Sequence, residues 1–196
     1  MDLVQRVQAV ILKPKEEWVK IKAESTSVAE LFTSYAMILA AIPAAGQFIG
    51  YALIGQRLPF IGLYRWGLGR ALGNAVLAYI FSLATVYLFA LIINALAPNF
   101  SSVQNMTNAM KLAVYSMTPG WVAGIFYIFP ALWILSILAS LYGLYILYLG
   151  YDTPMMETPK DKVLGYMVIS IIVVIVLYVV FALILGGIYA VRYHGL

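Results

Sequence analysis

The sequence lacks cysteine altogether and contains a single histidine, His194, close to its last residue. The absence of cysteine excludes disulfide bonds and thiolate metal sites. No basic run with interleaved aromatic residues occurs, which argues against nucleic-acid binding. The sequence therefore predicts no metal site, no cofactor and no nucleic-acid partner.

Charged residues are also scarce: they make up 10% of the chain, whereas 64% of its residues are hydrophobic. Soluble domains carry about 25% charged and about 45–50% apolar residues. A chain of this composition cannot cover its apolar surface with polar groups, so its solvent must be lipid. The predicted fold is all-α, a polytopic membrane protein in which each spanning helix uses about 20 apolar residues.

Residues 1–27 form a charge-rich segment that we predict to be cytoplasmic and amphipathic. The apolar residues of its first helix share one face: Leu3, Val4, Val7, Val10 and Ile11. Arg6 lies on the opposite, polar face, so we expect a short helix on the membrane surface. The alternative is a helix packed on the cytoplasmic loops. Ser27 and Glu30 have capping-box spacing and predict the start of the first span.

Five apolar runs follow, and they predict a transmembrane domain over residues 28–196. The expected spans are 28–54, 71–97, 109–129, 131–150 and 163–191. Between residues 109 and 150 the only charge is Lys111, and such a helix would be about 60 Å long, about twice the thickness of a bilayer core. Two spans are therefore needed, and Pro130 marks the turn between them because proline disfavours a helical residue before it.

The distribution of positive charge predicts the orientation of the chain. With the N-terminus inside, the inner segments carry eight basic residues: Arg6, Lys13, Lys15, Lys20, Lys22, Lys111, Lys160 and Lys162. The outer segments carry four: Arg57, Arg65, Arg70 and Arg192. The positive-inside rule thus favours a multi-pass protein of the cytoplasmic membrane with its N-terminus in the cytoplasm and its C-terminus outside.

The interior of every predicted span lacks aspartate, glutamate, lysine, arginine and histidine. Ion-coupled transporters normally place ionisable groups there, so a proton-driven pump is not expected. An intramembrane hydrolase needs a base beside its nucleophile, and none accompanies the hydroxyl groups within the spans. We therefore predict that the protein is not an enzyme.

The first candidate site is a helix break in the third span. Its residues are Ser116, Thr118, Pro119 and Gly120. A broken helix of the transporter type would combine the hydroxyl groups with carbonyls that the proline frees. The interpretation that we favour is a structural kink whose freed carbonyl is met by a neighbouring hydroxyl.

Two further groups are candidates for lipid or ligand contact. Tyr142, Tyr145 and Tyr148 recur every three residues, either as a wall for a lipid or aromatic ligand or as a packing stripe. The loop arginines, Arg57, Arg65 and Arg70, would bind lipid phosphates or extend to the interface beside a surface helix.

Small residues four positions apart allow helix backbones to approach closely. The pairs are Gly46 and Gly50, Gly120 and Gly124, and Ser136 and Ser140. We predict that they pack helices within the monomer, and a homodimer is the alternative.

Four short motifs resemble those of the prokaryotic branch of the Yip family, the Ypt/Rab-interacting membrane proteins. They are "LKPKEEW", "YSMTPGW", "SLYGLYILYLG" and "PMMETPKDK". The resemblance implies five spans, a cytoplasmic N-terminus, and roles in vesicle traffic with Rab GTPase partners. The chain departs from the eukaryotic pattern because it has no long N-terminal region with an Asp-Leu-Tyr-Gly-Pro motif, which argues against a GTPase partner.

The function predicted from the sequence is that of a non-enzymatic integral membrane protein, a membrane-organising or trafficking-type scaffold. Its expected partners are membrane lipids and other membrane proteins. The alternative is a small transporter or channel for a lipid or uncharged solute that uses the break at Pro119 and Gly120. A continuous polar cavity would favour transport, whereas a dry, tightly packed interior would favour the scaffold.

Overall fold

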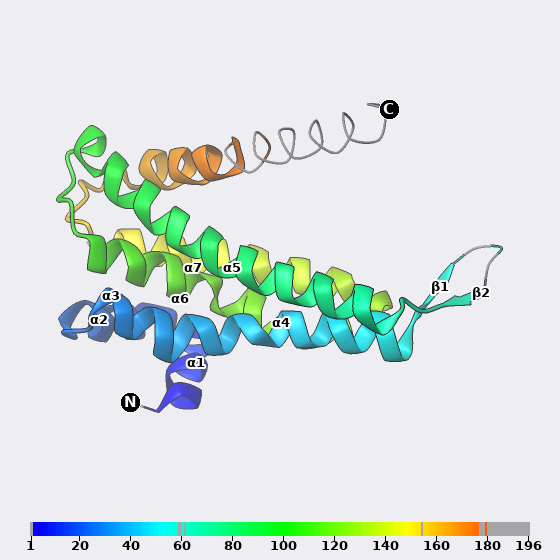
Figure 1. The fold of residues 1–196 in the computed structure, drawn as a ribbon. Helices are drawn as coiled ribbons and strands as arrows, with labels where there is room; N and C mark the ends of the chain where they lie inside the picture. The colour runs from blue at the N-terminus through cyan, green and yellow to red at the C-terminus, as the bar shows by residue number, and fades with distance from the viewer. Residues whose placement is uncertain (1, 59, 61, 154, 177–178, 180–196) are drawn as a thin grey trace.

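The computed structural model describes residues 2–58, 60, 62–153, 155–176 and 179, and it is a bundle of helices with one short hairpin at its end (Figure 1). The α-helices are α1 (Leu3–Leu12), α2 (Pro14–Ala23), α3 (Val28–Leu31), α4 (Met37–Ile49), α5 (Leu68–Leu96), α6 (Met106–Ala123) and α7 (Trp133–Asp152). Tighter or wider helical turns extend them: η1 (Phe32–Ala36), η2 (Gly50–Ile54), η3 (Ala97–Phe100), η4 (Gly124–Ile128) and η5 (Pro130–Leu132). A further apolar helix covers Val163–Val176. The predicted all-α class is confirmed.

Three helical runs in the described part of the chain are long and apolar enough to cross a membrane: Val28–Ile54, Leu68–Phe100 and Pro130–Asp152. The helix Val163–Val176 is shorter, and the remainder of the fifth predicted span, up to residue 191, lies largely outside the described residues. Five spans therefore stay a prediction. The predicted outer C-terminus lies outside the described residues as well.

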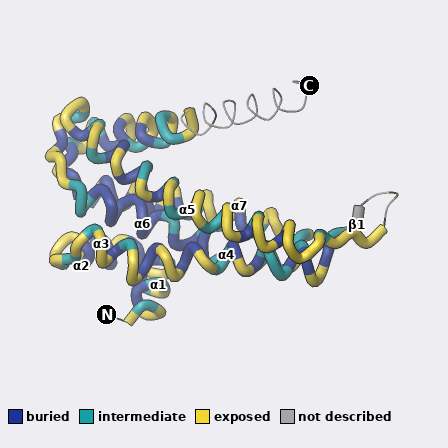
Figure 2. Tube along the Cα trace, in the orientation of Figure 1, coloured by how far each residue is buried: buried dark blue, intermediate teal, exposed yellow. Residues whose placement is uncertain are grey.

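Helix α6 forms the centre of the bundle and packs against α4, α5 and α7. Most of its residues are buried, and Figure 2 shows it as the darkest long helix. Its sequence carries Lys111, Ser116 and Thr118, and all three side chains are buried among other helices. A helix that meets protein on every side can carry polar groups at little cost, because those groups find hydrogen-bond partners there.

Helices α6 and α7 run antiparallel and approach closely through small residues. A Cβ atom on Gly143 would lie 2.5 Å from the carbonyl oxygen of Ser116, and one on Gly120 would lie 3.0 Å from Oγ of Ser140. The chain turns between the two helices where Phe129 is extended and Pro130 opens η5. Proline fixes its own φ for a first helical turn, so the turn lies where the sequence predicted it.

The helix break considered as a candidate site at Pro119 and Gly120 is not observed. Helix α6 continues through Pro119 to Ala123, and the change to a tighter helix comes at Gly124. Proline removes one backbone hydrogen bond from a helix, and the close contact of Gly120 with α7 holds the backbone beside it in place. The premise of a broken-helix site is therefore wrong. Pro43 likewise lies inside α4.

A two-stranded hairpin, which the sequence did not predict, follows η2. Strand β1 (Gln56–Leu58) pairs antiparallel with β2 (Gly62–Tyr64). Gly55 and Gly62 have φ values of 84° and 83°, which glycine adopts without steric cost. The hairpin projects from the end of the bundle opposite to α1 and α2 (Figure 1).

Candidate functional site

Helices α1 and α2 form an N-terminal cap, Leu3–Ala23, which packs against one end of α6 and α7. The cap is held by Trp18, whose indole nitrogen donates a hydrogen bond of 2.9 Å to the carbonyl oxygen of Ile146. The indole also lies against Gly150, where an added Cβ would be 2.7 Å from the ring. Tyr142 supports α1 through a hydrogen bond of 2.8 Å from its hydroxyl to the carbonyl of Ile11.

Lys111 of α6 attaches the end of α2 to the bundle. Its ammonium group donates hydrogen bonds of 2.8 Å and 2.6 Å to the carbonyl oxygens of Ile21 and Glu24, and the residue is 2% exposed. The last carbonyls of a helix have no partner within the helix and carry partial negative charge. The ammonium group of Lys111 donates hydrogen bonds to these carbonyls and also offsets their partial negative charge.

Arg6 forms the ionic centre of the cap. Its guanidinium binds the carboxylates of Glu17 and Glu24, and Lys20 lies 3.2 Å from the second oxygen of Glu17. Burial alone would lower the pKa of Arg6, but the hydrogen bond with Glu24 and the charges around the guanidinium outweigh it and raise that pKa. Arg6 therefore carries its charge at any pH at which the protein is folded.

The predicted orientation of α1 is wrong at Arg6. This residue, expected on the polar outer face, is buried against the bundle, whereas Val4, expected on the apolar inner face, is 58% exposed. Helical periodicity predicts only which face of a helix is apolar. It cannot predict that a carboxylate of α2 and one of the linker will pair with an arginine that faces inward. The cap therefore packs on α6 and α7. Whether α1 also lies on the membrane surface, or instead packs on the cytoplasmic loops, stays a prediction.

The Arg6–Glu17 pair should be energetically coupled. Arg6→Met leaves the carboxylate of Glu17, which is 1% exposed, without its closest cation, and should lower the free energy of unfolding by about 3 kcal/mol. Adding Glu17→Met should then cost less than it does alone, with a coupling of about 1–3 kcal/mol. Denaturant unfolding in detergent measures both. Lys20→Met is the control, and additivity of the two substitutions would contradict the prediction.

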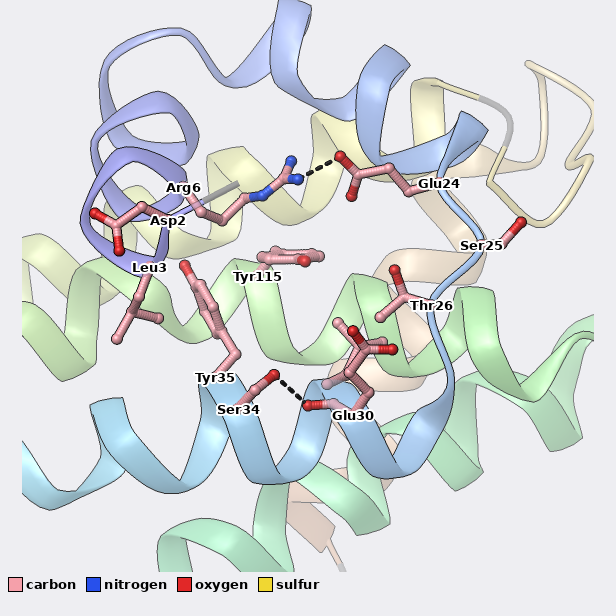
Figure 3. Close-up of a pocket in the computed structure, with 11 residues that line it drawn as sticks. Asp2, Leu3, Arg6, Glu24, Ser25, Thr26, Glu30, Ser34, Tyr35 and Tyr115 are labelled. Carbon is pink, nitrogen blue, oxygen red and sulfur yellow. Dashed lines mark hydrogen bonds and ion pairs between the residues drawn. The ribbon is translucent and has the colours of Figure 1, made fainter.

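A cavity of about 610 Å³ opens between the cap and the first long helix, and we call it the cap pocket (Figure 3). It is lined by Asp2, Leu3, Arg6, Glu24, Ser25, Thr26, Glu30, Leu31, Ser34, Tyr35 and Tyr115. These residues come from α1, the linker after α2, the α3–η1 turn and α6. Most are polar, so the cap pocket differs from the apolar grooves that face the spans.

Tyr115 forms the floor of the cap pocket. Its ring meets those of Trp18 and Tyr35 edge to face, with centroids 6.0 Å and 5.0 Å away, and Arg6 lies 5.8 Å from its centroid. The residue is 4% exposed, yet within the described part of the chain its hydroxyl has no hydrogen-bond partner. Among the described residues the enclosed side-chain polar atom that lacks a partner is Oδ1 of Asn94, so the oxygen of Tyr115 is open to the cap pocket and can bind a ligand there.

The residues of the predicted helix break serve the packing of the bundle. Thr118 and Tyr35 share a hydrogen bond of 3.0 Å between their hydroxyls, and Ser116 donates one of 3.0 Å to the carbonyl of Ala113. Pro119 is buried in α6 and Gly120 faces Ser140. Of these residues, Ser116 borders a cavity of about 120 Å³ that is otherwise mainly apolar.

The tyrosine stripe lies partly against the cap and partly on the exposed face of α7. Tyr142 is half-buried and binds α1, whereas Tyr145 and Tyr148 are exposed. The rings of Tyr142 and Tyr145 are in contact, with centroids 5.7 Å apart, and whether the stripe contacts a lipid or ligand stays a prediction. The contact of Tyr142 with the cap was missed because the sequence does not indicate which helix approaches α7.

The loop arginines lie at the hairpin end, away from the cap pocket. Arg70 stacks over the ring of Trp66 at 4.5 Å, and Trp66 stacks in turn on Tyr51 at 4.6 Å. Arg65 donates to the carbonyl of Ile54 at 3.4 Å. The side chain of Arg57 lies outside the described part of the chain. Whether these residues bind lipid phosphates stays a prediction.

The four short motifs meet at the cap end of the bundle. Trp18 of the first motif touches Tyr115 of the second and Ile146 of the third. In the fourth, the carbonyl of Met155 accepts a hydrogen bond of 2.8 Å from Asn108, near the start of α6. No sequence pattern signalled Arg6 or Tyr35 as site residues, whereas Tyr115 lies inside a motif that drew attention only to its proline.

The chain has relatives among known proteins. It is 27% identical to Inner membrane protein YohC of Escherichia coli strain K12 over 150 residues, a stretch that covers 75% of this chain and 77% of the relative. The same protein from Escherichia coli O6:H1 matches to the same extent. No solved structure matches. The model of the Yip1 domain family matches residues 9–184, and the chain therefore belongs to the Yip1 domain family of membrane proteins.

Proposed function

We propose that this protein is a non-enzymatic, multi-pass protein of the inner membrane that binds membrane lipid at the cap pocket and acts as a scaffold. The observation that carries the proposal is the contrast between the polar cap pocket, of about 610 Å³, and the packed bundle beside it. A polar recess at the end of apolar spans is suited to a headgroup whose acyl chains remain in the bilayer. The inner-membrane location of the relatives in Escherichia coli supports the same setting.

Transport is the weaker candidate. Helix α6 is continuous where a broken-helix site was expected, and the cavity beside Ser116, of about 120 Å³, is lined mainly by apolar side chains. Between α4 and η4, a Cβ on Gly124 would lie 2.5 Å from Pro43, which leaves little space for a solute there. This close packing supports a scaffold.

Native mass spectrometry of gently extracted protein tests the proposal. We expect the protein to retain phospholipid at a stoichiometry of about one per chain at low collision energy, because a built pocket holds its ligand more tightly than an annular surface. Proteoliposomes should show no flux of small uncharged solutes above protein-free liposomes. Loss of all lipid on extraction, or a solute flux that depends on the protein, would contradict it.

The orientation can be tested with single cysteines, since the chain has none of its own. Phe129, 54% exposed at the turn between α6 and α7, lies at the end of α7 remote from the cap. A cysteine at Phe129 should react with an impermeant maleimide in intact spheroplasts, whereas one at Leu12 should react only after permeabilisation. The reverse pattern would place the cap outside.

A further inference from the structure

We propose that the cap pocket recognises a primary ammonium group and that its ligand is a phospholipid with an ethanolamine-type headgroup. This inference rests on the proposed function, because it names the lipid class that the same pocket would select. It is carried by the charge balance of the pocket, by the free hydroxyl of Tyr115 and by the position of the pocket beside the first long apolar helix.

The lining of the cap pocket carries more negative than positive charge. Its carboxylates are Asp2, Glu24 and Glu30, and its one cation is Arg6. Three negative charges and one positive charge leave a formal balance of −2. The guanidinium of Arg6 is already paired with Glu24 and, behind the pocket, with Glu17, so Asp2 and Glu30 are the lining carboxylates that it leaves without a cation. An anionic headgroup is thus disfavoured and a cation favoured.

Two of these carboxylates have no partner within the described part of the chain. In a capping box the carboxylate of Glu30 would accept a hydrogen bond from the backbone amide of Ser27, and the amide of Glu30 would donate one to Oγ of Ser27. Only the second of these hydrogen bonds is present, at 3.1 Å. The carboxylate of Glu30 is left facing the pocket (Figure 3). Asp2 precedes α1 and does not cap it with its side chain. Both groups can therefore bind a ligand without breaking an existing contact.

The hydroxyl of Tyr115 supplies an independent sign of a ligand. In Figure 3 the ring lies between Arg6 and Glu24 on one side and Tyr35 and Glu30 on the other. Its oxygen, free of any hydrogen bond to described residues, can accept from an N–H group. A primary ammonium offers three such donors, so it can bind the hydroxyl and a carboxylate of the lining at the same time.

The position of the pocket favours a lipid over a soluble amine. The first candidate span begins at Val28, next to the lining residues Ser25 and Thr26, so the pocket lies at the level where a span leaves the hydrocarbon. Leu3 and Leu31 give the pocket an apolar wall. The hydroxyls of Ser25 and Thr26 can donate to the phosphate of a headgroup whose ammonium lies deeper.

The test compares three phospholipids with identical acyl chains, offered in equal amounts to purified protein before native mass spectrometry. They are phosphatidylethanolamine, phosphatidylcholine and phosphatidylglycerol. The quaternary ammonium of phosphatidylcholine has no N–H donor, and phosphatidylglycerol has no cation. We expect wild-type protein to retain phosphatidylethanolamine about tenfold over either, because charge-assisted hydrogen bonds are lost in both competitors.

Two substitutions distinguish an effect on ligand binding from an effect on stability. Tyr115→Phe keeps the ring and removes only the free oxygen, and Glu30→Gln keeps the shape of an exposed side chain and removes its charge. Each should reduce the preference for phosphatidylethanolamine several-fold without lowering the melting temperature. The matched controls are Tyr145→Phe on the exposed face of α7 and Glu16→Gln on the exposed face of α2, which should leave the preference unchanged.

The outcomes distinguish the two proposals. Equal retention of the three lipids by wild-type protein would overturn the ammonium site but not lipid binding, whereas retention of none would overturn the proposed function. A preference that survives both Tyr115→Phe and Glu30→Gln would also overturn the cap pocket as the site. Displacement of the lipid by free phosphoethanolamine would support the ammonium chemistry and assign the pocket to a soluble amine.

Discussion

Trp18→Ala should lower the free energy of unfolding by about 3–5 kcal/mol, the range for removal of a buried aromatic side chain. The indole is 1% exposed, and its removal leaves a cavity against Gly150 and an unpaired carbonyl at Ile146. The N-terminal cap would lose its deepest contact with α7. Thermal unfolding in detergent, followed by circular dichroism, measures the loss.

Two further variants identify why Trp18→Ala lowers the stability. Trp18→Phe keeps most of the packing and loses the hydrogen bond of the indole nitrogen, so it should cost less than Trp18→Ala. Trp66→Ala, at the other end of the bundle, removes a ring from the surface stack with Tyr51 and should cost less still. If Trp18→Ala melted at the same temperature as the wild type, the cap would not be docked as described.

Gly124→Ala should produce the second large effect, a destabilisation of about 1–3 kcal/mol caused by overpacking. The backbone at Gly124 has a φ of −56°, so an alanine suffers no conformational strain there. The added Cβ would, however, lie 2.5 Å from two atoms of Pro43, one of them backbone. Since neither α4 nor η4 can yield locally, the two helices must separate.

The chain offers a matched control for this substitution. Gly73, in α5, is exposed, and a Cβ added there would meet no other atom within 4 Å. Gly73→Ala should therefore stabilise the protein by about 0.5–1 kcal/mol, because alanine favours the helix. Equal effects at the two positions, measured by thermal unfolding, would contradict the packing of α4 against η4.

The apolar runs and the prolines predicted much of the helical layout. Composition and length predicted spans at 28–54, 71–97 and 131–150, and the structure has the apolar runs Val28–Ile54, Leu68–Phe100 and Pro130–Asp152. Pro130 located the turn between α6 and α7. The hairpin of β1 and β2 was missed because strands of three residues are too short to show the alternation of apolar and polar residues, which needs about four to eight residues to be recognised. The sequence alone could not decide whether Pro119 breaks the third helix, because that depends on the contacts of neighbouring residues such as Gly120 with α7.

The candidate site was less predictable than the fold. Arg6, Glu24 and Tyr115 are far apart in sequence, and their meeting depends on how α1 and α2 dock on α6. The amphipathic pattern predicted that Arg6 faces solvent, because the pattern depends on hydrophobicity alone. It contains no information on Glu17 and Glu24, with which Arg6 pairs in the folded chain. The residues that the sequence led us to expect in contact with a ligand include none that lines the cap pocket.

The contact between Trp18 and Ile146 also bears on how the protein is made. The two residues are 128 positions apart, and a ribosome adds about 5–20 residues per second, so α2 emerges roughly 6–25 s before the helix it docks on. Lys111 follows Ile21 by 90 residues, so the carbonyls of Ile21 and Glu24 lack this partner for most of the same interval. Helix α2 is thus synthesised well before α7, and the cap can complete its docking only after α7 has been made.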